Sequence, residues 1–143
     1  MINNRDLKYF KITKDISRLS DFKQTKIGAI LVYKKDILSV GFNSNKTSPI
    51  QKRFNQYREF DNPENAIHKI HAEISCIDKI PWYVYENDFD LGKAILYIYR
   101  EHKDNHRPAL SLPCPACMAA IKDMGIGIIK YSVENGFAYQ KLN

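Results

Sequence analysis

Apolar positions near the start of the chain recur every three or four residues, which is the spacing of an amphipathic helix. These positions are Tyr9, Ile12, Ile16 and Leu19. Asn3 or Asn4 can cap the first turn, because asparagine side chains accept hydrogen bonds from the free N–H groups of a helix start. We therefore expect a first helix whose apolar stripe lies on a sheet.

Two β-branched runs follow, at residues 26–33 (KIGAILVY) and 36–42 (DILSVGF). Only Lys34 and Lys35 separate them, so the pattern predicts an antiparallel hairpin. Gly28 and Gly41 interrupt the runs, and glycine inside a strand is typical of a close approach by a neighbouring backbone or a ligand. A sheet that contains this hairpin is expected to be mixed rather than purely parallel.

Residues 43–62 are polar and irregular, which is typical of a binding loop or of an ordinary connection with a short helix. The candidate ligand contacts in this segment are Asn43, Asn45, Lys46, Lys52, Arg53, Tyr57 and Arg58. Asn62-Pro63-Glu64 then has the pattern of a helix start, and apolar residues at 70, 74, 77 and 80 lead up to Pro81. This helix is expected to begin at Pro63 or only near His71.

The second half of the chain alternates strands and helices. Strands are expected over residues 94–100 and 126–132, with connections at 82–90 and 101–112. A helix should run from the second cysteine motif to Gly125, with Met118, Ile121 and Met124 facing inward. A turn at Asn135-Gly136 would lead into a short returning strand. The alternation predicts one domain over residues 1–143 with a three-layer α/β fold.

The length and the cysteine count limit the class of protein. The chain has 143 residues and three cysteines. This length suffices for a buried core without disulfides, and an odd number of cysteines favours a reducing compartment. The start has no apolar signal core, and the longest uncharged apolar run, residues 27–33, is too short to cross a bilayer. We therefore expect a cytoplasmic protein without a membrane segment.

Charge is distributed unevenly along the chain. Residues 1–60 hold 13 Lys or Arg against 5 Asp or Glu, whereas residues 61–143 hold 9 against 11. A basic half suits a phosphate-bearing ligand, although a solvated helix face and a lysine-rich loop would give the same count. Charge alone does not separate a nucleotide from a polynucleotide.

Two short motifs carry the chemistry: His71-Ala72-Glu73 and Pro113-Cys114-Pro115-Ala116-Cys117. One imidazole and two thiolates are what a tetrahedral zinc site takes when its fourth position is left to water. If each motif opens a helix, Cys114 and Cys117 share a face, and the helix N-terminus favours the thiolate. We therefore predict a catalytic zinc site at His71, Cys114 and Cys117, where two helix N-termini converge over the strand ends.

Glu73 is the candidate catalytic group. It lies two residues after His71, about 200° around a helix, so it is not placed to bind the same ion from the same face. It can instead reach a bound water. The two motifs together have the form found in zinc nucleobase deaminases, in which this glutamate acts as general acid and base.

Other interpretations of these residues stay open. Cys114 and Cys117 could form half of a four-thiolate structural site or a redox pair, but Cys76 is the only other thiol. Cys76 is most simply a buried apolar residue. His68 is expected to be exposed, and the alternatives are a supporting role behind His71 or a second metal site.

With these residues placed, the chain resembles the cytidine and deoxycytidylate deaminase superfamily, and within it the deoxycytidylate branch, including phage-type members. Beyond the two motifs, the likeness includes residues 25–32 (TKIGAILV), 39–43 (SVGFN) and 123–126 (DMGI). It implies a three-layer α-β-α fold with a mixed sheet, one catalytic zinc ion per subunit and a homo-oligomer. The chain departs from the branch at its end, where its relatives continue with another helix and a fifth parallel strand but only 11 residues follow position 132.

The resemblance also implies roles for individual residues. It gives the zinc to the same histidine and cysteines, proton transfer to Glu73, and a hydrogen bond with the substrate sugar to Asn43. The backbone N–H groups of Ala72 and Cys114 would contact the pyrimidine carbonyl. A backbone carbonyl at or beside Leu112 would meet the leaving amine.

The expected function is zinc-dependent hydrolytic deamination of a free cytosine nucleotide, with dCMP giving dUMP and ammonia. One rival is a deaminase of cytosine in single-stranded nucleic acid or of adenosine in tRNA, which needs stacking aromatics along a groove. Residues 43–57 supply few aromatics, although Arg100, His102, His106 and Arg107 could help. The other rival, a non-catalytic zinc module that binds nucleic acid or a partner, gives no reason for Glu73 or for an open coordination position.

Overall fold

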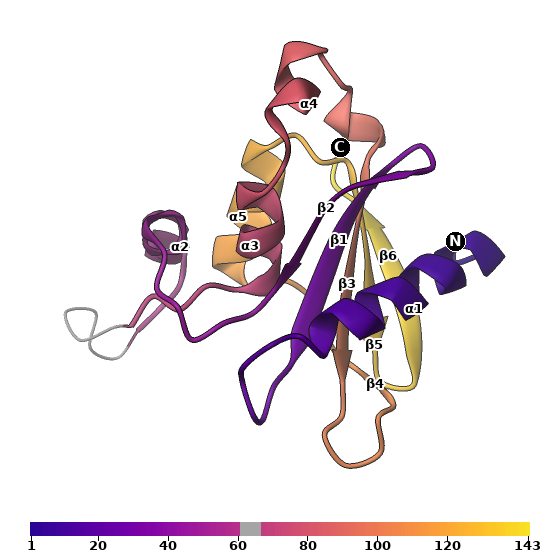
Figure 1. Cartoon of the computed structure of the whole chain (residues 1–143), viewed down its shortest axis with the longest axis vertical. Helices are drawn as coiled ribbons and strands as arrows, with labels where there is room; N and C mark the ends of the chain where they lie inside the picture. Colours follow the sequence, from indigo (N-terminus) through magenta and orange to yellow (C-terminus); the bar gives the residue numbers. More distant parts are fainter. Residues whose placement is uncertain (61–66) are drawn as a thin grey trace.

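The computed structural model describes residues 1–60 and 67–143, and Asn62-Pro63-Glu64, the predicted helix start, lies outside these residues. The elements in chain order are α1 (Asn4–Ser17), β1 (Ile27–Tyr33), β2 (Asp36–Phe42), α2 (Pro49–Phe54), η1 (Asn55–Tyr57), α3 (Ala72–Asp78), α4 (Trp82–Glu86), η3 (Leu91–Lys93), β3 (Ile95–Glu101), β4 (Pro108–Ala109), α5 (Pro115–Asp123), β5 (Ile128–Val133) and β6 (Gly136–Lys141). Figure 1 shows how they are arranged.

The strands form a mixed sheet in the order β2-β1-β3-β5-β6, with the short strand β4 paired to β3. β1 is antiparallel to both β2 and β3, whereas β3 and β5 run parallel. The expected hairpin is therefore confirmed, with Tyr33 opposite Asp36 across Lys34 and Lys35. The last strand, β6, returns antiparallel to β5.

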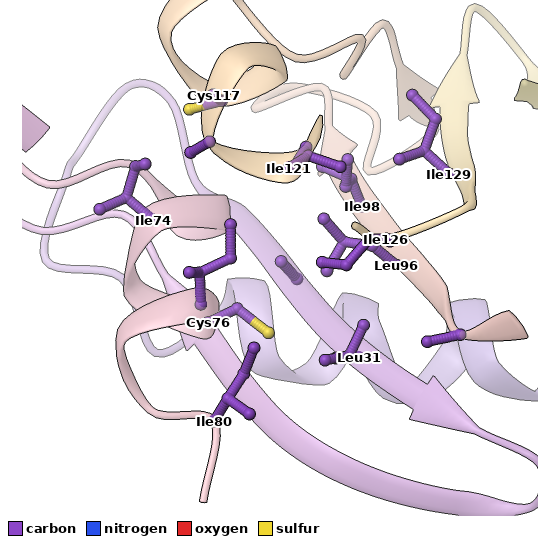
Figure 2. Packing of buried hydrophobic residues seen from close by; sticks show 14 of the residues in the cluster. Leu31, Ile74, Cys76, Ile80, Leu96, Ile98, Cys117, Ile121, Ile126 and Ile129 are labelled. Atoms are coloured by element: carbon purple, nitrogen blue, oxygen red, sulfur yellow. The ribbon is translucent and has the colours of Figure 1, made fainter. Parts of the chain in front are cut away.

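Helices cover both faces of the sheet and give three layers, as predicted (Figure 1). Successive side chains of a strand point to opposite faces. In β1, Ala29 and Leu31 belong to the core under α3 and α5, whereas Ile30 and Val32 belong to the core under α1. Figure 2 shows the first of these cores, where isoleucines from both helices meet the strands.

The first helix differs in part from the predicted stripe. Asn3 caps it through a reciprocal hydrogen-bonded box with Asp6, but the helix ends at Ser17, so Leu19 lies beyond it and is 60% exposed. A Cβ atom at Gly28 would lie 2.5 Å from the Thr13 carbonyl oxygen. Because α1 approaches β1 this closely, small residues rather than Leu19 occupy the contact at the end of the helix.

Gly41 provides the second close approach that the sequence predicted. A Cβ atom at this position would lie 2.4 Å from the backbone nitrogen of Cys76 and 2.6 Å from the carbonyl oxygen of Ala72. Helix α3 therefore rests directly on β2. Cys76 is buried as expected, with its sulfur 3.2 Å from Ser39 Oγ, and burial raises the pKa of its thiol to about 12.

Two further predictions need correction, and a third is confirmed. The connections 82–90 and 101–112 contain the short elements α4 and β4. The last turn is Glu134-Asn135, because Asn135 takes the left-handed conformation at φ 59° and leaves Gly136 free to pair with Val133. In α5 the buried face carries Ala116, Cys117, Ala120 and Ile121, and the half-buried Met118 and Met124 pack against the same core, so these side chains face inward as predicted.

A buried group of three residues, here called the Asp6 cluster, joins α1 to the sheet. Its members are Asp6, Tyr97 and Lys130. Lys130 Nζ lies 2.8 Å from Asp6 Oδ2, and the Tyr97 hydroxyl donates to Asp6 Oδ1 at 2.5 Å. Burial opposes ionisation of Asp6, but hydrogen bonds from Lys130 and Tyr97 outweigh it, so the pKa of this carboxyl is lowered.

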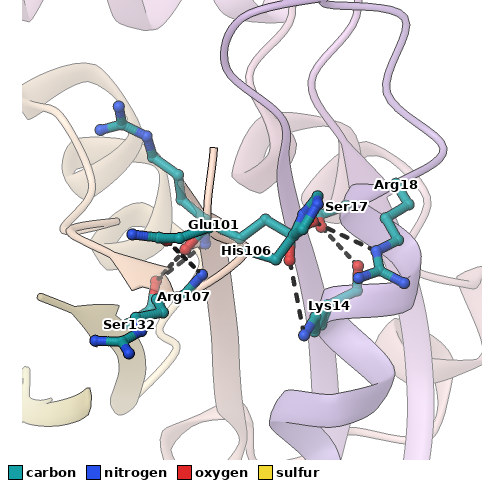
Figure 3. A network of polar contacts seen from close by, with 9 residues as sticks. Lys14, Ser17, Arg18, Glu101, His106, Arg107 and Ser132 are labelled. Carbon is teal, nitrogen blue, oxygen red and sulfur yellow. Dashed lines mark hydrogen bonds and ion pairs between the residues drawn. The ribbon is translucent and has the colours of Figure 1, made fainter. Parts of the chain in front are cut away.

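A second polar group ties the end of α1 to the end of β3. Figure 3 shows Glu101 between Lys14, Arg18 and His106. The Glu101 carboxylate lies 3.4 Å from both Arg18 Nε and His106 Nδ1, and 3.8 Å from Lys14 Nζ.

Within residues 1–60 and 67–143, no helix combines the length and the apolar composition needed to cross a membrane.

Candidate metal and substrate site

The two motifs meet over one face of the sheet, as predicted, and bring three possible metal ligands together. We call His71, Cys114 and Cys117 the ligand triad. Cys114 Sγ lies 3.5 Å and Cys117 Sγ 3.3 Å from His71 Nδ1, and all three ligand atoms lie within 4.8 Å of one another. Among the residues that the structure describes, no fourth side chain joins this group.

The distances within the ligand triad fit zinc. Zinc takes sulfur at about 2.3 Å and imidazole nitrogen at about 2.05 Å, which in a tetrahedral site places sulfur and nitrogen roughly 3.6 Å apart. The two observed separations, 3.5 and 3.3 Å, are close to this value. One nitrogen and two sulfurs also match the ligand preference of zinc for three protein ligands at a catalytic site.

Helix starts position the ligands. His71 is the N-cap residue of α3, and Cys114 is the N-cap of α5, where Pro115 follows in the first turn. Neither N-cap side chain hydrogen-bonds to its own helix. Both side chains are instead directed into the ligand triad, so two helix ends are joined through the residues that would bind the metal.

The contact between Cys114 and Cys117 favours a state in which one sulfur is a thiolate and the other a thiol. The hydrogen bond from Cys117 lowers the pKa of Cys114, and a hydrogen bond from His71 acts in the same direction. The same contact with Cys114, together with burial, raises the pKa of Cys117. The pair therefore favours a thiolate on Cys114, which is the less buried of the two sulfurs.

Glu73 lies in the first turn of α3 and is 5% exposed. Burial raises the pKa of its carboxyl above the ordinary value, while the nearby His71 opposes the shift. The side chain nevertheless contributes to the wall of a cleft beside His71 and Cys114. It is therefore close to the ligand triad without being part of it.

This cleft has a volume of about 330 Å³, which lies within the size range of small-molecule sites. Beside the residues already named, its wall includes Phe22, Thr25, Asn43, Lys69, Arg100 and Leu112. Two of the predicted substrate contacts, Asn43 and Leu112, are therefore on the cleft. The third, Ala72, is fully buried between His71 and Glu73.

The amide of Asn43 is already held by the backbone at and just before the start of β1. Its Oδ1 accepts from the Ile27 N–H at 2.9 Å, and its Nδ2 donates to the Thr25 carbonyl at 2.8 Å. An amide has two donor hydrogens and two acceptor lone pairs, so one of each is still available to a ligand. Asn43 is thus fixed in orientation on the cleft wall.

The cleft wall carries two half-buried cations, Lys69 and Arg100, of which only Arg100 was predicted from the sequence. Lys69 Nζ donates to Asn45 Oδ1 at 2.9 Å and lies 5.4 Å from the centre of the Phe22 ring. Arg100 Nη1 is 3.5 Å from the Leu110 carbonyl oxygen. Arg100 was a sequence candidate, whereas Lys69 and Phe22 were missed because nothing in the local pattern distinguishes them from surface residues.

The candidates His102, His106, Arg58 and His68 do not line the cleft. His102 Nε2 is 2.6 Å from Glu134, and His106 contacts Glu101, so both histidines face carboxylates away from the cleft wall. Arg58 Nη1 lies 3.4 Å from His71 Nε2. His68 was expected to be exposed, but it is half-buried because its ring nitrogen Nδ1 is 2.9 Å from Asn55 Nδ2.

Comparison with known proteins agrees with this site. The family model described as the cytidine and deoxycytidylate deaminase zinc-binding region matches residues 3–133. The resemblance seen in the two motifs is therefore confirmed at the level of the family. No curated protein matches the chain.

Solved structures share the fold at low identity. The dCMP deaminase of cyanophage S-TIM5 in its apo form is 23% identical, with a TM-score of 0.59, over 92% of this chain and 84% of that one. The same enzyme in complex with dCMP and dUMP is 21% identical, with a TM-score of 0.59, over 92% of this chain and 82% of that one. Cytidine deaminase from Burkholderia pseudomallei is 14% identical, with a TM-score of 0.55, over 94% and 91% of the two chains.

Proposed function

The chain belongs to the cytidine and deoxycytidylate deaminase family, and on this premise we propose that it deaminates a free cytosine nucleotide, converting dCMP and water to dUMP and ammonia. The proposal depends chiefly on one observation. Two members of the ligand triad, His71 and Cys114, and the carboxyl of Glu73 line a cleft of nucleotide size whose wall also carries two cations.

Each group of the site has a chemical task in this reaction. Zinc held by His71, Cys114 and Cys117 would supply a Lewis acid that lowers the pKa of water from about 15.7 to roughly 7. The Glu73 carboxylate takes a proton from the attacking water as oxygen bonds to C4 of the cytosine, and it delivers this proton to N3. Glu73 then takes the second proton from the new C4 hydroxyl and delivers it to the exocyclic amine, so the C4–N bond breaks, ammonia leaves and the C4 carbonyl forms.

The surroundings of Glu73 suit a group that both accepts and donates protons. Burial keeps competing water away from its carboxyl and raises its pKa, so the protonated form is easier to reach than for an exposed glutamate. A raised pKa brings a glutamate closer to the operating pH of a general acid and base. One residue can therefore serve both halves of the reaction.

The cations support a nucleotide rather than a nucleoside. With the base beside His71 and Glu73, Lys69 and Arg100 are the charged side chains on the cleft wall that a 5′-phosphate could contact. Both can donate charge-assisted hydrogen bonds, which are stronger than neutral ones. The two histidines proposed for a nucleic-acid groove contact Glu134 and Glu101 instead and do not line the cleft, which argues against the polynucleotide alternative.

A substrate panel tests this proposal. The zinc-loaded protein is assayed by ultraviolet absorbance and ammonia release on deoxycytidine, cytidine, their mono-, di- and triphosphates, and a cytosine-bearing oligonucleotide. We expect turnover of dCMP with a kcat/KM at least about tenfold above that of deoxycytidine, as a charged hydrogen bond worth roughly 1.5–3 kcal/mol would give. Activity only on the oligonucleotide, or equal activity on nucleoside and nucleotide, contradicts the proposal.

The substitution Arg100→Gln tests whether Arg100 causes the expected preference for dCMP over deoxycytidine. It should reduce kcat/KM for dCMP about tenfold and leave deoxycytidine nearly unchanged, because only the phosphate contact is lost. Arg107→Gln is the matched control, since Arg107 is exposed and absent from the cleft wall. Equal effects of the two substitutions would argue against a specific phosphate contact.

A further inference from the structure

The backbone of the ligand His71 is held by a side chain from another helix. Gln51, in α2, is fully buried, and its Oε1 accepts a hydrogen bond from the His71 N–H at 2.9 Å. Its Nε2 donates to Asn55 Oδ1 at 2.8 Å. Asn55 is 3% exposed and contacts His68 Nδ1 through Nδ2 at 2.9 Å. Two buried amides thus connect α2 and η1 to the segment before α3.

The chemistry of the partners fixes the direction of each amide. The backbone N–H of His71 can only donate, so the Gln51 atom facing it must be the oxygen. The Gln51 nitrogen then faces Asn55, which must present its own oxygen. The nitrogen of Asn55 is left to donate to His68. The directions of the other two hydrogen bonds, Gln51 to Asn55 and Asn55 to His68, therefore follow from the one made to the metal ligand.

His71 needs such support because its side chain is not available to stabilise its own helix start. An N-cap residue normally fixes its backbone by hydrogen-bonding to the following turn, but the His71 imidazole faces the sulfurs instead. Neighbouring residues are held by backbone contacts, since the Ile70 N–H donates to the Lys46 carbonyl at 2.9 Å. At His71 the corresponding N–H donates to Gln51.

The position of Gln51 excludes direct contact with substrate. Its side chain is completely buried and does not contribute to the cleft wall. Burying an amide is unfavourable unless its donors and acceptors are paired, and satisfied buried networks make a region rigid. The hydrogen bond to the His71 N–H is therefore the contact by which the Gln51 side chain reaches the ligand triad.

We propose that Gln51 is a positioning residue for the metal: through the hydrogen bond between its Oε1 and the His71 N–H it sets the direction from which the imidazole approaches the ion, and Asn55 holds the Gln51 amide in the required orientation. The inference rests on the ligand triad of the proposed function. It does not depend on which cytosine compound is the substrate.

Metal binding tests the proposal directly. Gln51→Met keeps the length and volume of the side chain but removes the acceptor, whereas Gln51→Glu keeps an oxygen that can face the His71 N–H. Gln56→Met, at an exposed position, is the control for the substitution itself. Zinc affinity is measured by competition with a chromophoric chelator, and ligand geometry by the absorption spectrum of the cobalt(II) form.

We expect Gln51→Met to weaken zinc binding about 10- to 100-fold, which is typical for residues that orient a metal ligand. The cobalt absorption bands should shift in Gln51→Met, and Gln51→Glu should restore both properties in large part. Gln56→Met should match the wild type. If Gln51→Met binds zinc with wild-type affinity and gives an unchanged cobalt spectrum, Gln51 only stabilises the fold and the proposal is wrong.

A second variant keeps the test decisive if Gln51→Met does not fold. Asn55→Leu leaves the acceptor of Gln51 in place but removes the partner that orients its amide, so we expect the same shift in the cobalt spectrum with a smaller loss of zinc affinity. An unchanged spectrum overturns the proposal. A wild-type protein that binds zinc but deaminates no cytosine compound would contradict the proposed function and leave this inference standing.

Discussion

The Asp6 cluster and the ligand triad lie on opposite faces of one sheet, and they differ in whether their charges are matched. The Asp6 carboxylate receives hydrogen bonds from Lys130, Tyr97 and the Asn3 N–H. The ligand triad instead directs two sulfurs and an imidazole nitrogen at one another. The first group contains its own cation, Lys130, whereas the second consists of three electron-pair donors of the kind that bind zinc.

This difference separates stability from chemistry. A matched buried ion pair fixes α1 on the sheet and needs no further partner. A set of converging donors gains its partner only from solution, and a metal that binds the folded state would stabilise it by mass action. Substitutions in the Asp6 cluster should therefore lower stability, whereas substitutions in the ligand triad should lower zinc binding and turnover. The largest expected effect comes first below.

Cys117→Ser should have the largest effect. It replaces a buried thiolate ligand by a hydroxyl that zinc rarely binds, so zinc affinity and dCMP turnover should each fall by more than about 100-fold, the upper end expected for residues that only support a ligand. Metal content after dialysis and ammonia release measure the two losses. A variant that loses zinc and keeps its turnover would show that the metal is not catalytic.

Glu73→Ala should abolish activity without removing the metal. Loss of a general acid and base costs about 10²- to 10⁴-fold in turnover, while the ligand triad is unchanged. Steady-state kinetics and zinc content measure this separation. Near-wild-type turnover would remove Glu73 from the mechanism, and loss of zinc would mean that Glu73 also supports the ligands.

Lys130→Met should show the opposite behaviour, with a loss of stability and unchanged chemistry. It leaves the Asp6 carboxylate buried without its cation, which typically costs about 3–5 kcal/mol in the free energy of unfolding. Denaturant unfolding measures this cost, and dCMP turnover below the unfolding temperature should match the wild type. The double variant Asp6→Asn/Lys130→Met should be more stable than Lys130→Met alone, and a stability equal to the single variant would contradict the role of the pair.

The pH dependence of stability should show the smallest effect. The pKa of Asp6 is lower in the folded protein than in the unfolded chain, so its contribution to stability is fully present above about pH 3.9 and is lost as the pH falls toward the folded value. The stability difference between the wild type and Asp6→Asn/Lys130→Met should therefore shrink below about pH 4. A difference that stays constant down to pH 2 would show that Asp6 is not ionised when folded.

The sequence predicted those parts of the site that depend on residue type and short spacing. The pair Cys114 and Cys117, with His71 and Glu73 two residues apart, was recognisable because it has the form found in zinc nucleobase deaminases, and helix geometry explains the spacing. The glycines at 28 and 41 also marked real backbone contacts. The three-layer fold followed from the alternation of elements.

Contacts between distant segments could not be predicted in this way. Gln51 is buried only because residues 44–48 run beside residues 68–70, and no local periodicity distinguishes it from the exposed Gln56. For the same reason His68 was assigned to the surface and Lys69 was missed. The homo-oligomer and the cytoplasmic location stay predictions.

The contact of α3 with Gly41 has a consequence for how this site can change. His71 precedes one short helix and Glu73 lies in its first turn, and the backbone of this helix touches a strand with no side chain between them. A methyl group at position 41 would displace the proposed metal ligand and the proposed proton carrier in the same direction, as a single rigid body. A shift of α3 would therefore leave His71 and Glu73 aligned with each other. It would change their alignment with Cys114 and Cys117 at the start of α5.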